Sequence, residues 1–230
     1  MNIAIIAAAG AGTRMVSDRP KQFLLLAGMP VVFHTLKPFE ACAQVHEVIV
    51  VLPAAESAGF LSSAGKYGLR KLTRVVPGGA TRADSVKRGL MAIRPATAEI
   101  VVVHDGVRPF VTVAEIESTI AAAQSDGAAI LVAPVTDTIK QVSDRAVVKT
   151  LDRALLRRAL TPQCFQYELL RQAYQRTDVN DPSLTDESAL VEQLGKRVTV
   201  VEGSSRNIKI TTAEDIAVAE AMLATDYTDH

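Results

Sequence analysis

The run Asn2-Ile3-Ala4-Ile5-Ile6-Ala7-Ala8-Ala9-Gly10-Ala11-Gly12-Thr13-Arg14 carries an apolar stretch straight into a glycine-rich turn. Residues 3–8 are typical of a strand buried inside a sheet. No basic residue precedes them and glycine soon ends the apolar run, so they do not make a secretion signal. Small residues in the turn let backbone N–H groups approach phosphate oxygens, and Arg14 and Lys21 behind it supply positive charge. The stretch therefore predicts the first strand of an α/β fold with a phosphate site at its end.

The alternation of strand and helix continues along the chain. Short β-branched or alanine-rich runs predict further strands at residues 47–52, 72–76, 100–103 and 128–132. Segments with helical periodicity lie between the strands, at residues 31–42, 54–66, 83–93 and 113–124. Repeated strand–helix units predict a single Rossmann-like α/β domain over residues 1–230, with a mostly parallel sheet flanked by helices. Ligands of such sheets bind at the carboxyl ends of the strands.

The pattern changes after Pro134. Two polar-alternating extended runs, residues 137–140 and 146–151, surround Ser143-Asp144 and predict a protruding β-hairpin. An isolated hairpin is marginally stable in water, so this arm, residues 135–153, is expected to pack on a second subunit of a homodimer. Beyond it the sequence predicts two helices, a strand and a last helix, at residues 167–176, 186–193, 197–202 and 212–223.

The composition narrows the class of protein. Lys plus Arg equals Asp plus Glu at 25 each, which argues against a nucleic-acid or membrane-surface binder. Cys42 and Cys164 match neither a disulfide framework nor a metal-binding spacing, and they are expected to be buried thiols in a reducing compartment. No apolar stretch approaches the roughly 20 residues that cross a bilayer. We expect a cytoplasmic enzyme.

Three interpretations compete for the glycine turn taken alone. A dinucleotide-binding GxGxxG motif would need glycine in place of Met15 and an acidic residue in place of Leu52-Pro53. A P-loop would need GxxxxGK[ST], which the sequence lacks. A tight turn with solvated cations remains the third interpretation.

Blocks spread over nearly the whole chain resolve these alternatives by resemblance. Gly10-Ala11-Gly12-Thr13-Arg14-Met15 with Pro20-Lys21-Gln22 resembles the nucleotidyltransferase signature of the 2-C-methyl-D-erythritol 4-phosphate cytidylyltransferases of the non-mevalonate isoprenoid pathway. Six further blocks follow in the family's order: Gly78-Gly79-Ala80-Thr81-Arg82-Ala83-Asp84-Ser85-Val86, His104-Asp105-Gly106-Val107-Arg108-Pro109, Pro134-Val135-Thr136-Asp137-Thr138-Ile139-Lys140, Thr161-Pro162-Gln163, Thr185-Asp186-Glu187 and Asn207-Ile208-Lys209-Ile210-Thr211. The resemblance implies a stand-alone enzyme that transfers CMP from CTP to a small polyol phosphate and releases pyrophosphate.

The family motifs imply roles on the nucleotide side. Arg14, Lys21 and Lys209 would surround the α-phosphate, where preorganised cations stabilise the charge that develops in the transition state. Backbone groups and one hydroxyl would recognise cytosine and hold the phosphates, in a pocket whose small residues exclude a purine. The residues assigned to it are Ala8, Ala9, Gly10, Gly12, Gly79, Ala80 and Ser85. Without the motif, Ser85 is more typical of a helix N-cap or a surface hydroxyl.

The motifs also imply a metal and an acceptor site. Asp105, where a strand ends, would bind Mg²⁺ and contact substrate, because Mg²⁺ needs only one or two carboxylates when phosphates complete its coordination. Without the motif, Asp105 is more typical of a turn cap or a partner of Arg108. We leave His104 out of the metal site, since magnesium prefers oxygen. The acceptor phosphate and hydroxyls would be held by Arg108, Thr138, Thr185 and Arg153, the last delivered by the arm of the other subunit.

Two departures from the family pattern bear on the acceptor. Arg157 stands where the family often has an aromatic residue, and Gly106-Val107 replaces a commoner Ala-Ala pair. Ribitol 5-phosphate cytidylyltransferases share most of these blocks and are the first alternative. A non-catalytic nucleotide-binding module is the second, although it would be expected to lose the catalytic cations, and Arg14, Lys21 and Lys209 are all present.

Overall fold

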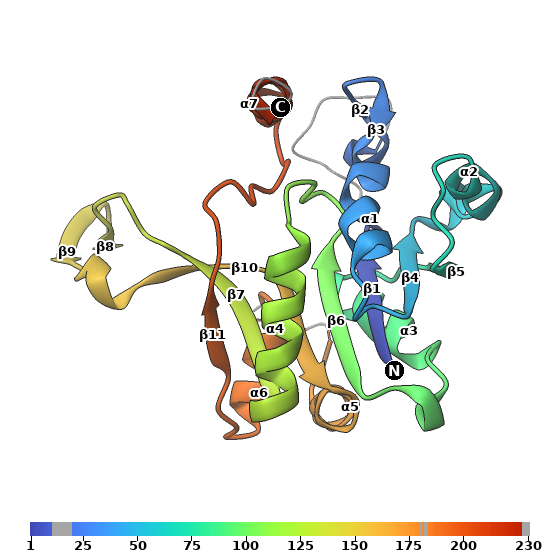
Figure 1. Cartoon of the computed structure of the whole chain (residues 1–230). Coiled ribbons are helices and arrows are strands. Elements are labelled where there is room, and N and C mark those ends of the chain that lie inside the picture. Colours follow the sequence, from blue (N-terminus) through green and yellow to red (C-terminus); the bar gives the residue numbers. More distant parts are fainter. Residues whose placement is uncertain (11–19, 180, 182–183, 227–230) are drawn as a thin grey trace.

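Strands with apolar residues on both faces build the centre of the molecule, which a computed structural model describes for residues 1–10, 20–179, 181 and 184–226 (Figure 1). The sheet has seven strands in the order β11-β7-β10-β6-β1-β4-β5. These strands are β1 (Asn2–Ala7), β4 (Glu47–Leu52), β5 (Leu72–Pro77), β6 (Ile100–Asp105), β7 (Ala128–Pro134), β10 (Arg157–Gln166) and β11 (Thr199–Glu202). All neighbouring pairs are parallel except those of β10, which confirms the mostly parallel α/β domain.

The strand order places a ligand crevice beside β1. The chain runs from β1 to β4 and β5 on one side and then crosses to β6 on the other side of β1. Ile5 pairs with Ile49 of β4 and with Val103 of β6, so the three strands end together. Loops that leave the sheet in opposite directions at such a switch point open a crevice at the carboxyl ends.

Alternate residues of each strand pack against opposite layers of helices. In β1, Ala4 and Ile6 belong to one apolar cluster while Ile3 and Ile5 belong to the other. The helices α1 (Val31–Ala41), α2 (Phe60–Gly65) and α4 (Val113–Asp126) cover the first face. The helices α3 (Arg82–Met91), α5 (Tyr167–Arg176) and α6 (Glu187–Gln193) cover the second. Because strand side chains alternate, each strand contributes to both halves of the core.

The last helix closes the end of the molecule that carries the crevice. Helix α7 (Ala213–Asp226) lies beside the short hairpin of β2 (Leu25–Leu26) and β3 (Met29–Pro30) in Figure 1. Ala219 of α7 packs with Leu26, Val107 and Ile210 in a small cluster of its own. Short 3₁₀ turns complete the chain: η1 (Lys21–Phe23), η2 (Ala54–Glu56), η3 (Pro95–Thr97) and η4 (Arg153–Leu155). None of the helices within the described residues is both long and apolar enough to cross a bilayer.

One sequence prediction of local structure is wrong, and one strand is missed. The helix expected over 54–66 is interrupted and forms two separate elements, η2 and α2. Gly59, which lies between them, adopts a left-handed conformation with φ +75° that a continuous helix does not allow. The strand β10 is missed because it contains Pro162, and a proline within a run argues against a central strand. The other expected strands and helices of the domain are confirmed with small shifts at their ends.

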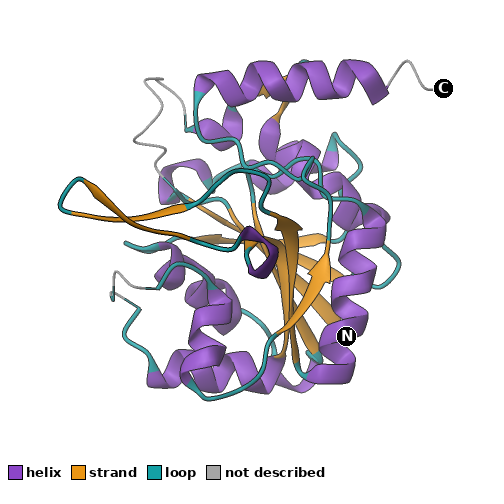
Figure 2. Cartoon of the chain, turned by 90° about the vertical axis from the view of Figure 1, so that its left-hand side faces the viewer, coloured by secondary structure: helices purple, strands orange, loops and turns teal. Residues whose placement is uncertain are grey.

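The predicted hairpin arm is confirmed, but its first strand is shifted. It consists of β8 (Lys140–Ser143) and β9 (Ala146–Thr150), so the strand expected at 137–140 begins where that range ends. Asp144 and Arg145 have positive φ angles, which matches the twist of a two-residue hairpin turn. Figures 1 and 2 show the arm standing away from the sheet, and every residue of β8 and β9 is exposed.

Candidate functional site

A cleft of about 430 Å³ lies at the carboxyl ends of β1 and β6. Its walls combine small residues with charged ones: Ala7, Ala8, Ala9, Gly10, Lys21, Gln22, Gly79, Ala80, Thr81, Arg82, Ser85, Asp105, Val107, Lys209 and Thr211. The structure thus brings together nine residues expected at the site: Ala8, Ala9, Gly10, Lys21, Gly79, Ala80, Ser85, Asp105 and Lys209. The other two nucleotide-side predictions, Gly12 and Arg14, lie outside the described residues.

The small residues have a steric reason. A Cβ on Gly78 would lie 2.2 Å from Cβ of Ala9, and one on Gly106 would lie 2.5 Å from Cβ of Ala8. The loops after β5 and β6 therefore touch the loop after β1 closely, and backbone hydrogen bonds fix the contact. Gly106 N–H donates to Ala7 O at 2.8 Å. Backbone atoms therefore form the floor of the cleft, and a residue larger than glycine does not fit at Gly78 or Gly106.

Hydrogen bonds at the start of α3 hold the glycine loop. Thr81 is the N-cap of α3, and its Oγ1 accepts from Asp84 N–H at 3.0 Å. Ser85 therefore is not the N-cap that its residue type by itself favours. Its Oγ accepts from Gly79 N–H at 3.0 Å and donates to Thr81 O at 2.9 Å. Ser85 lines the cleft and fixes the backbone of the loop that surrounds it.

Gln22 is a site residue that the sequence reasoning missed. Its side chain is buried, and Nε2 donates to Ala8 O at 2.7 Å. This bond joins the turn that carries Lys21 to the loop after β1, although residues 11–19 separate the two in the sequence. The signal was available, because Gln22 belongs to the Pro20-Lys21-Gln22 block.

Three cations surround the buried carboxylate of Asp105. Arg82 Nε lies 3.1 Å from Oδ1, while Lys209 Nζ and Arg108 Nε lie 2.9 Å and 3.3 Å from Oδ2. Burial alone would raise the pKa of Asp105, but the charges of Arg82, Lys209 and Arg108 outweigh it and hold the pKa well below its usual range. Asp105 is an anion at every physiological pH, and it faces the cleft with Lys209.

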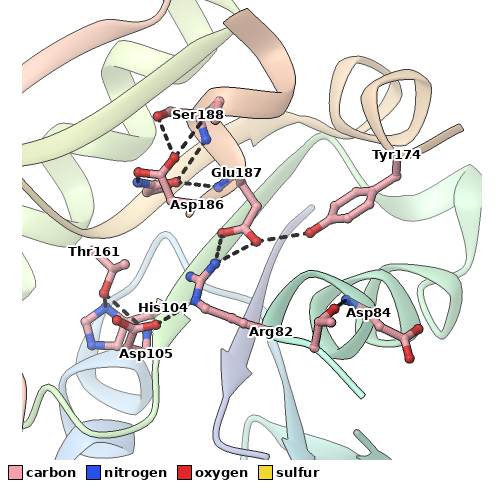
Figure 3. Close-up of polar contacts among 12 residues, drawn as sticks. Arg82, Asp84, His104, Asp105, Thr161, Tyr174, Asp186, Glu187 and Ser188 are labelled. Atoms are coloured by element: carbon pink, nitrogen blue, oxygen red, sulfur yellow. Dashed lines mark hydrogen bonds and ion pairs between the residues drawn. The ribbon is translucent and has the colours of Figure 1, made fainter. Parts of the chain in front are cut away.

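Arg82 and Glu187 form a second pair that the sequence reasoning left without a role (Figure 3). Arg82 Nη1 donates to both carboxylate oxygens of Glu187 at 2.8 Å. Glu187 is 1% exposed, and its Oε1 also accepts from Tyr174 OH at 3.0 Å. Both residues stand inside family blocks, but nothing in the sequence shows that positions so far apart meet.

His104 is a neutral structural residue behind the carboxylate. The His104 ring nitrogen Nε2 lies 3.2 Å from Arg108 O, which can only accept, so Nε2 carries the hydrogen of the neutral ring. Nδ1 therefore accepts from the hydroxyl of Thr161 at 2.9 Å, and Thr161 Oγ1 in turn accepts from Asp105 N–H at 3.2 Å. Burial lowers the pKa of His104 to about 4, which keeps the ring uncharged.

The donor set fits a magnesium ion only together with substrate. Within the described residues, no three His, Cys, Asp or Glu side chains gather as a metal-binding cluster. Asp105 offers one carboxylate, whose oxygens also form ion pairs with Arg82 and Lys209. One carboxylate is sufficient when phosphate oxygens and water complete an octahedral site. The chemistry of Asp105 therefore suits an ion that enters with a triphosphate.

None of the four residues expected to hold the acceptor phosphate and hydroxyls is among the described residues that line the cleft. Arg108 is buried, and its Nη1 donates to Asn207 O at 2.8 Å, so it supports the segment that carries Lys209. Thr138, Arg153 and Thr185 are exposed and are not among the described residues that line the cleft. Arg153 donates to Thr136 O at 2.7 Å at the base of the arm.

Comparisons with known proteins agree with this geometry. Residues 2–225 match the family model of 2-C-methyl-D-erythritol 4-phosphate cytidylyltransferase. Curated proteins of that name from Pelotomaculum thermopropionicum and Syntrophotalea carbinolica are each 45% identical over 96% of this chain, covering 93% and 95% of their own lengths. The crystal structure of 4-diphosphocytidyl-2C-methyl-D-erythritol synthase from Anaerococcus prevotii superposes with a TM-score of 0.84 at 32% identity, covering 97% of this chain and 98% of that one.

Proposed function

The chain belongs to the 2-C-methyl-D-erythritol 4-phosphate cytidylyltransferase family, and from this we infer the reaction of its cleft. It transfers CMP from CTP to 2-C-methyl-D-erythritol 4-phosphate in the biosynthesis of isoprenoid precursors. An oxygen of the acceptor phosphate attacks the α-phosphorus of CTP, a P–O bond forms there, and the bond to pyrophosphate breaks. The products are 4-diphosphocytidyl-2-C-methyl-D-erythritol and pyrophosphate. The observation that supports this most directly is a cleft that sets Lys21 and Lys209 against loops of small residues.

We propose that the loops after β1 and β5 bind the cytidine. Ala8, Gly79 and Ala80 line the cleft beside the close contact of Ala9 with Gly78. Backbone carbonyl and N–H groups complement the amine, ring nitrogen and carbonyl of cytosine, and the narrow wall disfavours a purine.

Lys21 and Lys209 are the proposed transition-state cations, with Arg14 as a third in the segment outside the described residues. The attacking phosphate is already an anion, so no general base is needed. What the site must do is align two polyanions and offset their repulsion, which is a matter of positioning and electrostatics. Lysine acts well here because its ammonium is a compact point charge.

We also propose that Asp105 holds Mg²⁺ together with oxygens of CTP. A bound ion would supply charge to the triphosphate and to the departing pyrophosphate. Asp105 then has two roles, since its Oδ2 also holds Lys209 beside the cleft at 2.9 Å. Addition of a chelator is the direct test of this requirement.

Pyrophosphate release tests the reaction and the acceptor together. The purified chain is mixed with CTP and Mg²⁺ and offered either methylerythritol 4-phosphate or ribitol 5-phosphate. We expect turnover with the first acceptor at a kcat/KM at least about tenfold above the second. Equal use of both acceptors would contradict the acceptor assignment, and no release with either would contradict the reaction.

A homodimer formed through the arm is the third proposal. Val142, Val147 and Val148 are 65%, 62% and 61% exposed on the arm, and Leu155 beside it is 83% exposed. A two-stranded hairpin with apolar side chains in water lacks the packing that stabilises such an element. A second copy of the chain would cover these residues and would place Arg153 against the acceptor of its partner.

Replacing Arg153 with alanine tests the arm. We expect the KM for the acceptor to rise about tenfold or more while the KM for CTP stays within about twofold, because one charge-assisted contact to a phosphate contributes about 1.5–3 kcal/mol. Lys149→Ala removes another exposed cation from the arm and serves as the matched control. A similar rise in both Michaelis constants of Arg153→Ala would argue against an acceptor contact.

We place the protein in the cytoplasm. Cys42 and Cys164 are buried free thiols on the described structure, as expected from the sequence. Burial raises the pKa of both, so they stay protonated and unreactive. Unpaired buried cysteines are typical of proteins from reducing compartments.

A further inference from the structure

An ion pair joins the partly exposed Arg82, which lines the cleft, to the buried Glu187. Arg82 is the first residue of α3, and Glu187 is the first residue of α6. The two are 105 positions apart in the sequence, yet Arg82 Nη1 contacts both oxygens of Glu187 at 2.8 Å. Figure 3 shows the guanidinium of Arg82 between the carboxylates of Glu187 and Asp105. Arg82 therefore bridges a buried anion behind the cleft and an anion at its wall.

Glu187 is held so firmly that it can act as an anchor. Its side chain is 1% exposed, and Oε1 accepts a hydrogen bond from Tyr174 OH in addition to the contact with Arg82. Its backbone N–H donates to Gln163 Oε1 at 3.1 Å, and Asp186 caps the same helix through Ala189 N–H. A buried carboxylate without a cationic partner is strongly unfavourable, so Arg82 is confined to the position that Glu187 sets.

The position of Arg82 also determines the orientation of the Asp105 carboxylate. Arg82 Nε binds Oδ1 at 3.1 Å, while Oδ2 contacts Lys209 Nζ at 2.9 Å and Arg108 Nε at 3.3 Å. If Arg82 moved, Oδ1 would lose its cationic partner. Rotation of the carboxylate toward the two remaining cations would then weaken the contact that holds the ammonium of Lys209 at the cleft. Three ion pairs, Glu187–Arg82, Arg82–Asp105 and Asp105–Lys209, thus join Glu187 to the proposed transition-state cation.

We propose that Glu187 and Arg82 are positioning residues for the transferase reaction. Glu187 orients Arg82, Arg82 orients Asp105, and Asp105 presents Lys209 to the α-phosphate. The inference rests on the proposed function of Lys209 and deepens it. Because the pair acts on the geometry of a transition-state contact, its loss lowers kcat and leaves the binding of CTP nearly unchanged.

The test compares Glu187→Gln with the wild type in the same pyrophosphate-release assay. This variant keeps the shape and a hydrogen-bond acceptor for Tyr174 but removes the charge that holds Arg82. We expect kcat to fall at least tenfold, whereas the Kd of CTP, measured by calorimetric titration without acceptor, changes less than threefold. Arg82→Lys keeps the cation but removes the planar fork whose Nε and Nη1 reach Asp105 and Glu187 separately. It is expected to show the same fall in kcat with little change in the Kd of CTP, and it provides the result if Glu187→Gln does not fold.

Two control variants separate positioning from stability. Glu47→Gln makes the same change in the Glu47–Arg74 ion pair, which is outside the cleft, and Ile120→Val removes one methylene from the buried core under α4. Both control variants are expected to keep the kcat of the wild type. This holds for Ile120→Val even if its melting temperature falls as far as that of Glu187→Gln. The double variant Arg82→Lys/Glu187→Gln is expected to be no slower than the slower single variant, because both changes break one chain of contacts.

Three results would overturn the inference. One is a kcat of folded Glu187→Gln within twofold of the wild type, and another is additive losses in the double variant. The third is a rise in the Kd of CTP as large as the loss in kcat, which would make Arg82 a direct phosphate ligand. If the wild type itself released no pyrophosphate, the proposed function would fail first and this inference with it.

Discussion

Replacing Lys209 with alanine is expected to lower kcat by about 10³-fold, which corresponds to about 4 kcal/mol of transition-state stabilisation. The ammonium lies 2.9 Å from Asp105 Oδ2 at the wall of the cleft, where charge accumulates as the acceptor attacks. Removing it leaves Asp105 with Arg82 and Arg108, so the buried carboxylate keeps two cationic partners. The fold should therefore survive. Initial rates of pyrophosphate release at saturating CTP and acceptor measure the effect.

The matched control is Lys196→Ala, which removes an exposed lysine before β11, at the opposite end of the sheet from the cleft. It should keep the kcat of the wild type. Circular dichroism and a melting curve establish that Lys209→Ala is folded. Wild-type turnover by the folded Lys209→Ala protein would refute the role of Lys209, whatever the effect on KM.

Replacing Gly78 with alanine is expected to weaken CTP binding at least about 100-fold. The added Cβ would lie 2.2 Å from Cβ of Ala9 and 3.1 Å from Oγ of Ser85. Ala9 Cβ moves only with its backbone, so the loops after β1 and β5 must separate. Those loops form the proposed cytosine wall, and their displacement removes several backbone contacts to the base at once. Calorimetric titration with CTP measures the loss.

Gly65→Ala is the control for this substitution. Gly65 is the last residue of α2, and an added Cβ would meet no atom within 4 Å. Alanine there should leave CTP binding unchanged and raise stability by about 0.5–1 kcal/mol, because glycine is the poorer helix former. Normal CTP affinity in Gly78→Ala would show that the wall between Ala9 and Gly78 takes no part in nucleotide binding.

The residues of the site could be predicted from the sequence only where a local pattern carried the information. Ala8, Gly79, Asp105 and Lys209 stand at the ends of recognisable strands or in motifs, and the structure places all four on one cleft. Arg108 also belongs to a motif, but the structure buries it beside Asn207, where it supports the segment of Lys209. A motif indicates that a residue is used without showing which way its side chain points.

The amino-acid sequence by itself determined the parallel α/β core, because apolar residues that alternate between two buried faces have no other way to be covered. Small residues such as Ala9 and Gly78 also determined where the loops after β1 and β5 could come into contact. Only the tertiary structure decided that Arg82 meets Glu187, that β10 enters the sheet antiparallel, and that the arm stands free of the body. These features depend on contacts between distant segments. Local propensity contains no information about such contacts, and chain folding alone brings their partners together.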